Sequence, residues 1–222
     1  MAKSSLYHLN NFIKDYQQEI KNIEHLNIIL VGPSGVGKTT LINALLKLNL
    51  KTGYGIPQTE KIEYHTFDEI PFLRLADSKG IEKNRLADVE EISKAVEAFI
   101  QEQLKESDPD KYIHCLWYCF TGTRLEGSEI EVLKKMSEIY TADKLPFIIV
   151  YTHAMSLENI EKAKNYIHGE LQLNNEFIEV LAEEDTIDTD DGKIIVKHPK
   201  NLDKLVEKSL EKSIQSINSS CF

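Results

Sequence analysis

The stretch LNIILVGPSGVGKTT, residues 26–40, constrains the fold more than any other part of the chain. Its first six residues form a continuous apolar run, which is typical of a strand buried on both faces of a parallel sheet. A glycine-rich segment follows directly, and residues 38–47 then have a helical pattern. We therefore predict a strand, a loop and a helix in immediate succession, the unit from which α/β domains are built.

The loop in this unit has the composition of a phosphate-binding loop. Residues 32–39, GPSGVGKT, match the pattern G-x-x-x-x-G-K-[ST] between a strand and a helix, which is the context that supports such a match. Gly35 and Gly37 allow backbone N–H groups to curl around phosphate oxygens. Lys38 is expected to reach the β- and γ-phosphates, and Thr39 to place its hydroxyl on Mg²⁺. The residues expected to contact a bound nucleotide here are Ser34, Gly35, Val36, Gly37, Lys38, Thr39 and Thr40.

Strand and helix patterns alternate along the rest of the chain. Further strands are expected at 62–67, 72–77, 112–120, 146–151 and 177–182, and further helices at 89–104, 130–140, 157–167 and 202–214. This alternation predicts an α/β fold, with a mostly parallel six-stranded sheet covered by helices on both faces. In such a sheet the ligand lies outside the carboxyl ends of the strands.

Two further segments place this loop in a family. Asp77 ends an apolar strand and opens the pattern D-x-x-G at 77–80, and GYGIPQT (53–59) lies between the two motifs. Together they resemble a GTPase of the translation-factor-related superclass, of the Era-like and septin-like kind, over about residues 26–215. The resemblance implies that Thr59 closes on Mg²⁺ and γ-phosphate, and that Asp77 holds Mg²⁺ through water. The N–H of Gly80 would touch the γ-phosphate. The expected catalytic residues are then Lys38, Thr59 and Gly80, and the expected metal residues Thr39, Thr59 and Asp77, with Thr66 as a rival for Thr59.

The residue after the D-x-x-G glycine bears on the rate of hydrolysis. Relatives of the Ras kind have a glutamine there, which orients the attacking water. Here the residue is Ile81, which cannot do so. We expect slow intrinsic turnover, with the missing function supplied by Gln58, by a second protomer across the nucleotide face or by an activating protein.

The base-binding loop departs from the family pattern. Where that pattern has [NT]-K-x-D, this chain has Thr152-His153-Ala154-Met155, so methionine replaces the aspartate that reads guanine. T-H-A resembles the paraseptin branch, the immunity-associated and chloroplast-import GTPases, in which the histidine packs against the base. That resemblance implies that Ala182 offers its N–H to the guanine oxygen and that Glu183 or Glu184 supplies the acceptor. The residues expected to contact the base end of the nucleotide are Thr152, His153, Ala182 and Glu183.

The domain boundaries follow from these motifs. Residues 1–25 are expected to contain an amphipathic helix, which packs on the domain or alternatively meets a partner or a membrane surface. A G domain should span 26–217, with a small acidic hairpin insertion at 183–197 that turns at Asp191-Gly192, and a tail at 218–222.

Composition narrows the function classes. The net charge of −10 argues against nucleic acid as the main partner. No apolar stretch reaches the length of roughly 20 residues that spans a bilayer, and three cysteines make no disulfide framework, which favours a reduced, cytoplasmic compartment. The leading hypothesis is a GTP/GDP switch with slow Mg²⁺-dependent hydrolysis. A nucleotide-binding assembly scaffold and an ATP-using P-loop enzyme are the alternatives, the latter disfavoured by a total of only three arginines.

Overall fold

A computed structural model gives the architecture of the chain. It describes residues 24–46, 63–66, 68, 70–78, 94–96, 98–99, 101–102, 108–125, 127–142, 145–189 and 192–220. The predicted N-terminal helix lies outside these residues, and so do Gln58, Thr59, Gly80 and Ile81. Most of the helix expected at 89–104 and the end of the tail lie outside them as well.

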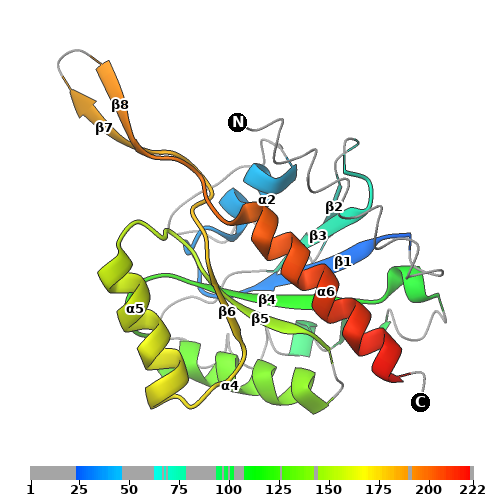
Figure 1. Cartoon of the computed structure of the whole chain (residues 1–222). Coiled ribbons are helices and arrows are strands. Elements are labelled where there is room, and N and C mark those ends of the chain that lie inside the picture. Colours follow the sequence, from blue (N-terminus) through cyan, green and yellow to red (C-terminus); the bar gives the residue numbers. More distant parts are fainter. Residues whose placement is uncertain are drawn as a thin grey trace.

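The core of the fold is a six-stranded sheet in the order β2-β3-β1-β4-β5-β6. Its strands are β1 (Leu26–Val31), β2 (Glu63–His65), β3 (Leu73–Asp77), β4 (Cys115–Phe120), β5 (Phe147–Tyr151) and β6 (Glu176–Glu179). All neighbouring pairs are parallel except β2 with β3. The α/β architecture and the mostly parallel sheet predicted from the sequence are therefore confirmed, and β1, at the centre, delivers its loop to the carboxyl edge (Figure 1).

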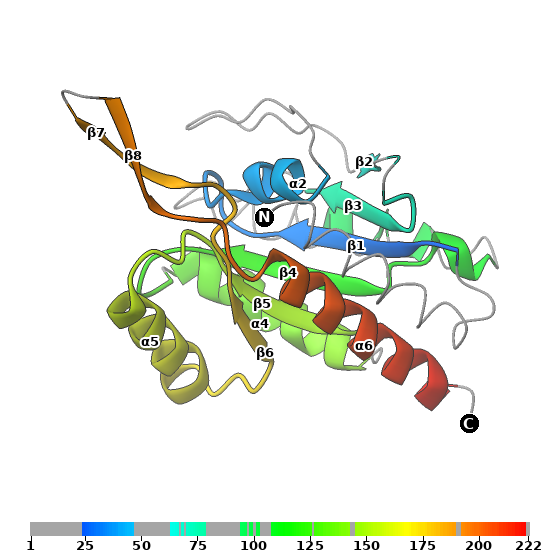
Figure 2. The same cartoon turned by 45° about the horizontal axis from the view of Figure 1, so that its top comes forward.

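Helices cover both faces of the sheet, as Figures 1 and 2 show. The helices are α2 (Lys38–Leu46), α4 (Gly127–Ala142), α5 (Leu157–Asn165) and α6 (Leu202–Ser220). Side chains of α2 and α6 form one buried cluster with Leu26, Ile28 and Leu30, while α4 and α5 form a second with Ile29 and Val31. Adjacent residues of β1 thus enter opposite layers, which explains why its sequence is apolar throughout.

Several element boundaries differ from the sequence prediction. Among these differences, β2 covers only Glu63–His65, α4 begins at Gly127 and α6 extends to Ser220. β4 begins at Cys115, and residues 112–114 separate it from a 3-10 turn, η1, at Pro109–Lys111. The helix that begins as α5 continues as a π-helix, η2, over Tyr166–Glu170. β6 ends at Glu179, and Leu181 instead forms an isolated bridge with Lys200.

A two-stranded hairpin stands apart from the sheet. β7 (Asp185–Thr189) pairs with β8 (Gly192–Lys197) in the expected hairpin, and both views show it projecting away from the body of the domain. The bridge between Leu181 and Lys200 joins the two ends of the hairpin at its base. Among the described helices, none is long and apolar enough to cross a membrane.

Candidate nucleotide-binding site

The loop after β1 turns at a glycine that no other residue could replace without strain. Gly32 has φ +148°, and a Cβ at this position would lie 2.0 Å from the carbonyl oxygen of Cys119 on β4. The backbone of β4 therefore packs directly against the start of the loop, where only a residue without a side chain fits. This contact fixes the path of the chain into the glycine-rich turn.

The side chain of Lys38 hydrogen-bonds back to the start of the loop. Its Nζ donates to the carbonyl oxygens of Gly32 and Pro33, both at 3.0 Å, and the side chain is buried. Burial lowers the pKa of Lys38, although the carboxylate of Asp77 acts in the opposite direction. The result is a cation held against the loop whose N–H groups would cradle phosphate oxygens, while its contact with the β- and γ-phosphates remains a prediction.

Thr39 and Asp77 meet beside the loop. The hydroxyl of Thr39 donates to Oδ2 of Asp77 at 2.8 Å, joining the first turn of α2 to the end of β3. Asp77 is 3% exposed, and its Oδ1 has no hydrogen-bond partner among the described residues. The hydroxyl of Ser78, which the sequence analysis did not single out, is buried without a partner in the same way. Oxygen atoms left unpaired in a buried site are the donor type that Mg²⁺ prefers, so these residues fit the ion.

Thr152 fastens the end of β5 to the loop. Its hydroxyl lies 2.6 Å from the carbonyl oxygen of Val36 and 3.0 Å from that of Phe120. The sequence predicted a nucleotide contact for Thr152, whereas in the structure its hydroxyl lies within hydrogen-bond distance of two backbone carbonyls. A direct contact with the nucleotide remains a prediction. No pattern in the sequence identifies the backbone carbonyls that receive this hydroxyl.

His153 lies over the phosphate-binding loop. Its backbone has φ +53°, an uncommon conformation for a residue with a side chain. A Cβ built on Gly37 would lie 3.5 Å from His153 Nε2, so the imidazole occupies the space that the glycine leaves. Met155, which replaces the family aspartate, is 42% exposed. The histidine is thus near the phosphate-binding loop, and its contact with the base remains a prediction.

The segment after β6 carries the remaining predicted base contacts. Ala154 donates its N–H to the carbonyl oxygen of Val180 at 3.0 Å, which brings this segment beside the base-binding loop. Ala182 is half-buried, and Glu183 and Glu184 are exposed. The carboxylate of Glu184 lies 3.5 Å from His198 Nδ1. Thr59 and Gly80, both predicted for the γ-phosphate end, lie outside the described residues.

The glycine loop, its buried lysine and the threonine–aspartate pair stand together at the carboxyl edge of a parallel sheet. This arrangement defines a P-loop nucleotide-binding domain. A family model described as 50S ribosome-binding GTPase matches residues 27–153, more than half of the chain. The chain belongs to this GTPase family.

Two septins are similar to this chain in sequence. Septin-3 of Homo sapiens is 28% identical over 172 residues, which cover 67% of this chain and 47% of the relative. Septin-14 of Mus musculus is 30% identical over 166 residues, covering 67% of this chain and 38% of the relative. The chain thus spans about half the length, or less, of the septins it matches.

Two structures have a similar fold at low sequence identity. The septin GTPase domain from Chlamydomonas reinhardtii superposes with a TM-score of 0.61 at 17% identity, covering 89% of this chain and 96% of that domain. Toc33 from Arabidopsis thaliana gives a TM-score of 0.65 at 12% identity, covering 95% and 92%. At these identities the comparison shows the fold alone.

Proposed function

We propose that this chain is a guanine-nucleotide switch that binds GTP and GDP and hydrolyses GTP slowly with Mg²⁺. The observation that carries the proposal is the hydrogen bond between Thr39 and Asp77, next to the buried Lys38. A loop that only turned the chain would need neither a buried cation nor a buried carboxylate with an unpaired oxygen.

Thr39 and Asp77 would hold the metal ion, together with Thr59 as the sequence predicts. The bound ion would neutralise charge that develops on the phosphate oxygens. The protein residues provide the positioning: Lys38 offers a positive charge to the phosphates, and the N–H groups of the loop orient them. Because Ile81 follows Gly80, the chain's own turnover should be low.

Guanine preference would depend on the segment after β6. We assign His153 to the face of the base and the N–H of Ala182 to the guanine oxygen. Of the two candidate acceptors, Glu184 lies close to His198, so Glu183 is the better candidate for the two guanine donors that Met155 cannot accept from. A site that hydrogen-bonds particular groups rejects an analogue that lacks them strongly.

Calorimetric titration with GTP, GDP and ATP, each with Mg²⁺, tests this assignment. We expect the wild-type chain to bind GTP and GDP more tightly than ATP. Glu183→Ala should lose that margin, and the adjacent Glu184→Ala, which removes the same charge, should keep it. If ATP bound to the wild type as tightly as GTP does, the alternative of an ATP-using P-loop enzyme would be favoured. If no nucleotide bound, the phosphate-binding loop would be vestigial and an assembly role without nucleotide would be favoured.

Turnover is proposed to rise when two copies meet across the nucleotide face or when an activating protein binds. A similar fold belongs to chloroplast translocon components whose dimerisation is important for their GTPase activity. The specific activity should then increase with the concentration of this chain. A low activity that stays flat over that range would exclude self-activation and leave the activating partner.

A cytoplasmic location fits the proposed switch.

A further inference from the structure

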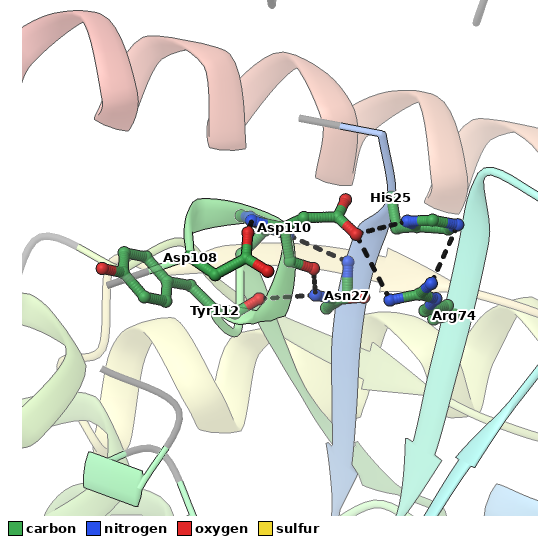
Figure 3. Close-up of polar contacts among 7 residues, drawn as sticks. His25, Asn27, Arg74, Asp108, Asp110 and Tyr112 are labelled. Carbon is green, nitrogen blue, oxygen red and sulfur yellow. Dashed lines mark hydrogen bonds and ion pairs between the residues drawn. The ribbon is translucent and has the colours of Figure 1, made fainter. Parts of the chain in front are cut away.

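A polar cluster lies at the edge of the sheet opposite the nucleotide site, roughly 20 Å away along β1. His25, the residue before β1, has its Nδ1 at 2.6 Å from Oδ2 of Asp110 in η1. Its Nε2 lies 2.9 Å from an Nη atom of Arg74 on β3. The second guanidinium nitrogen lies 3.5 Å from the same carboxylate oxygen, so the three side chains form a closed ring (Figure 3).

The ring fixes the protonation state of His25. A guanidinium has only donors, so Nε2 of His25 must accept the hydrogen bond from Arg74. Nδ1 must then carry the proton and donate it to Asp110, which makes the imidazole neutral and selects one tautomer. An imidazolium would turn an N–H at Nε2 toward the guanidinium, placing donor against donor and cation against cation. The observed arrangement of Arg74 is therefore incompatible with protonated His25.

A metal ion is a poorer explanation of the same residues. Glu24, His25 and Asp110 place their carboxylate and imidazole atoms within 4.8 Å of one another. A metal bound to Nδ1 would need the ring proton on Nε2, where Arg74 also donates. The position of Arg74 favours a proton rather than a metal at Nδ1.

The other side of the cluster is held independently of the imidazole. The buried side chain of Asn27 donates to the backbone carbonyls of Asp110 at 2.6 Å and Tyr112 at 2.8 Å. The N–H of Asp110 also donates to the carboxylate of Asp108 at 3.1 Å. These contacts hold η1 against β1 whether or not His25 is charged. The hydrogen bond between His25 and Arg74 is therefore the contact that protonation of His25 breaks.

We propose that His25, Asp110 and Arg74 form a proton-operated latch, in which neutral His25 holds Arg74 and protonated His25 releases it. The latch joins the far ends of the two strands that carry the site, because Asn27 pairs with Arg74 in the register that pairs Leu30 with Asp77. Proton binding by His25 is thereby linked to the contact between the ends of β1 and β3. The titratable groups on the elements that meet here are Glu24, Arg74, Asp108, Asp110, Lys111 and His114.

Long-range ¹H–¹⁵N NMR of the histidine rings in the whole chain tests the latch. At alkaline pH we expect His25 to carry its proton on Nδ1 and none on Nε2. As the pH falls, Nε2 should gain a proton, and the side-chain signals of Arg74 should shift with the same midpoint. Removing the guanidinium in Arg74→Met should let His25 bind its proton more tightly, because the donor and the charge that oppose a proton at Nε2 are then gone. Asp110→Asn should weaken proton binding.

His168 provides an internal control, because its Nδ1 lies 2.7 Å from the carbonyl of Leu173, away from this cluster. The ring signals of His168 should be the same in all variants. Arg74→Lys keeps the charge and should leave His25 closer to wild type than Arg74→Met does. The latch is overturned if wild-type His25 carries its proton on Nε2, if added Zn²⁺ binds at Nδ1, or if Arg74→Met folds and His25 titrates unchanged. If Arg74→Met fails to fold, the latch is tested instead by the tautomer of His25 in the wild type and by the NMR spectrum of Arg74→Lys.

Discussion

The hydroxyl of Thr152 donates a 2.6 Å hydrogen bond to the backbone carbonyl of Val36, and this bond ties the base-binding loop to the phosphate-binding loop. The two segments are more than 100 residues apart in the sequence. Their connection means that the position of His153, the next residue, depends on the conformation of the glycine loop. The loop after β5 and the phosphate-binding loop therefore form one hydrogen-bonded unit.

Replacing Thr152 by valine should weaken this unit. Valine keeps the shape of threonine but takes the hydroxyl away from the buried carbonyl of Val36, whereas the carbonyl of Phe120 still accepts the backbone N–H of residue 152. We expect the free energy of unfolding to fall by roughly 1–3 kcal/mol, the cost of a buried group that loses its partner. Urea denaturation measures this loss, and calorimetry should show weaker nucleotide binding. Thr152→Ser, which retains the hydroxyl, should lie closer to wild type in both measurements.

Gly32→Ala should be among the most damaging single changes in the loop. The new Cβ would collide with the carbonyl oxygen of Cys119, in a backbone conformation that residues with a side chain rarely adopt. Strain of this kind costs about 1–3 kcal/mol, and the collision adds to it. Thermal unfolding should therefore show a clear drop in Tm. Gly127→Ala is the matched control, because no atom lies within 4 Å of its added Cβ and the change should be neutral or stabilising. Equal effects of the two changes would contradict the proposed packing of β4 on the loop.

Ser209→Ala should destabilise the fold by removing a buried hydrogen bond between α6 and β4. The indole N–H of Trp117 on β4 donates to the hydroxyl of Ser209 at 2.8 Å, and both side chains are fully buried. Without the hydroxyl, the indole donor is left unpaired, which should cost roughly 1–3 kcal/mol in urea denaturation. The double variant Trp117→Phe, Ser209→Ala completes a mutant cycle that isolates the coupling. Additive losses would show that the two residues contribute independently.

Asp110 should make stability depend on pH in the acid range. Burial opposes ionisation of this carboxyl. The hydrogen bond from His25, the charge that His25 carries once the acid range protonates it, and the charge of Arg74 together outweigh burial, so the pKa of Asp110 is lowered in the folded state. A group with a depressed folded pKa stabilises the fold above its unfolded pKa, about 3.9 for aspartate, and this stabilisation is lost as the pH falls through the folded value.

The comparison of wild type with Asp110→Asn measures this contribution. Their free energies of unfolding should differ at neutral pH and should converge as the pH falls below 4. Glu158→Gln is the control, because its partner Lys162 forms an exposed ion pair with it, and such pairs contribute little. A difference between wild type and Asp110→Asn that stays constant down to pH 3 would contradict the assignment.

Much of the fold could be predicted from local patterns. The strand at 26–31, the glycine loop and the helix from Lys38 follow from hydrophobic runs and from a motif whose residues are contiguous. The predicted boundaries were wrong where tertiary contacts override local pattern. The apolar run YIHCLWYCF looks like a strand from residue 112, but η1 ends at Lys111 and β4 begins only at Cys115. β6 stops at Glu179 because Leu181 pairs with Lys200 across the base of the hairpin.

The sequence by itself determined the class of fold and the phosphate end of the site, because a phosphate-binding loop is a local structure that eight adjacent residues specify. Tertiary structure alone decided that Thr152 holds Val36, that Cys119 leaves no room beside Gly32, and that His25 meets Asp110 and Arg74. These contacts join residues between 49 and 116 positions apart. They form because the sheet order places β3, β1, β4 and β5 side by side, and no local pattern records which strands become neighbours.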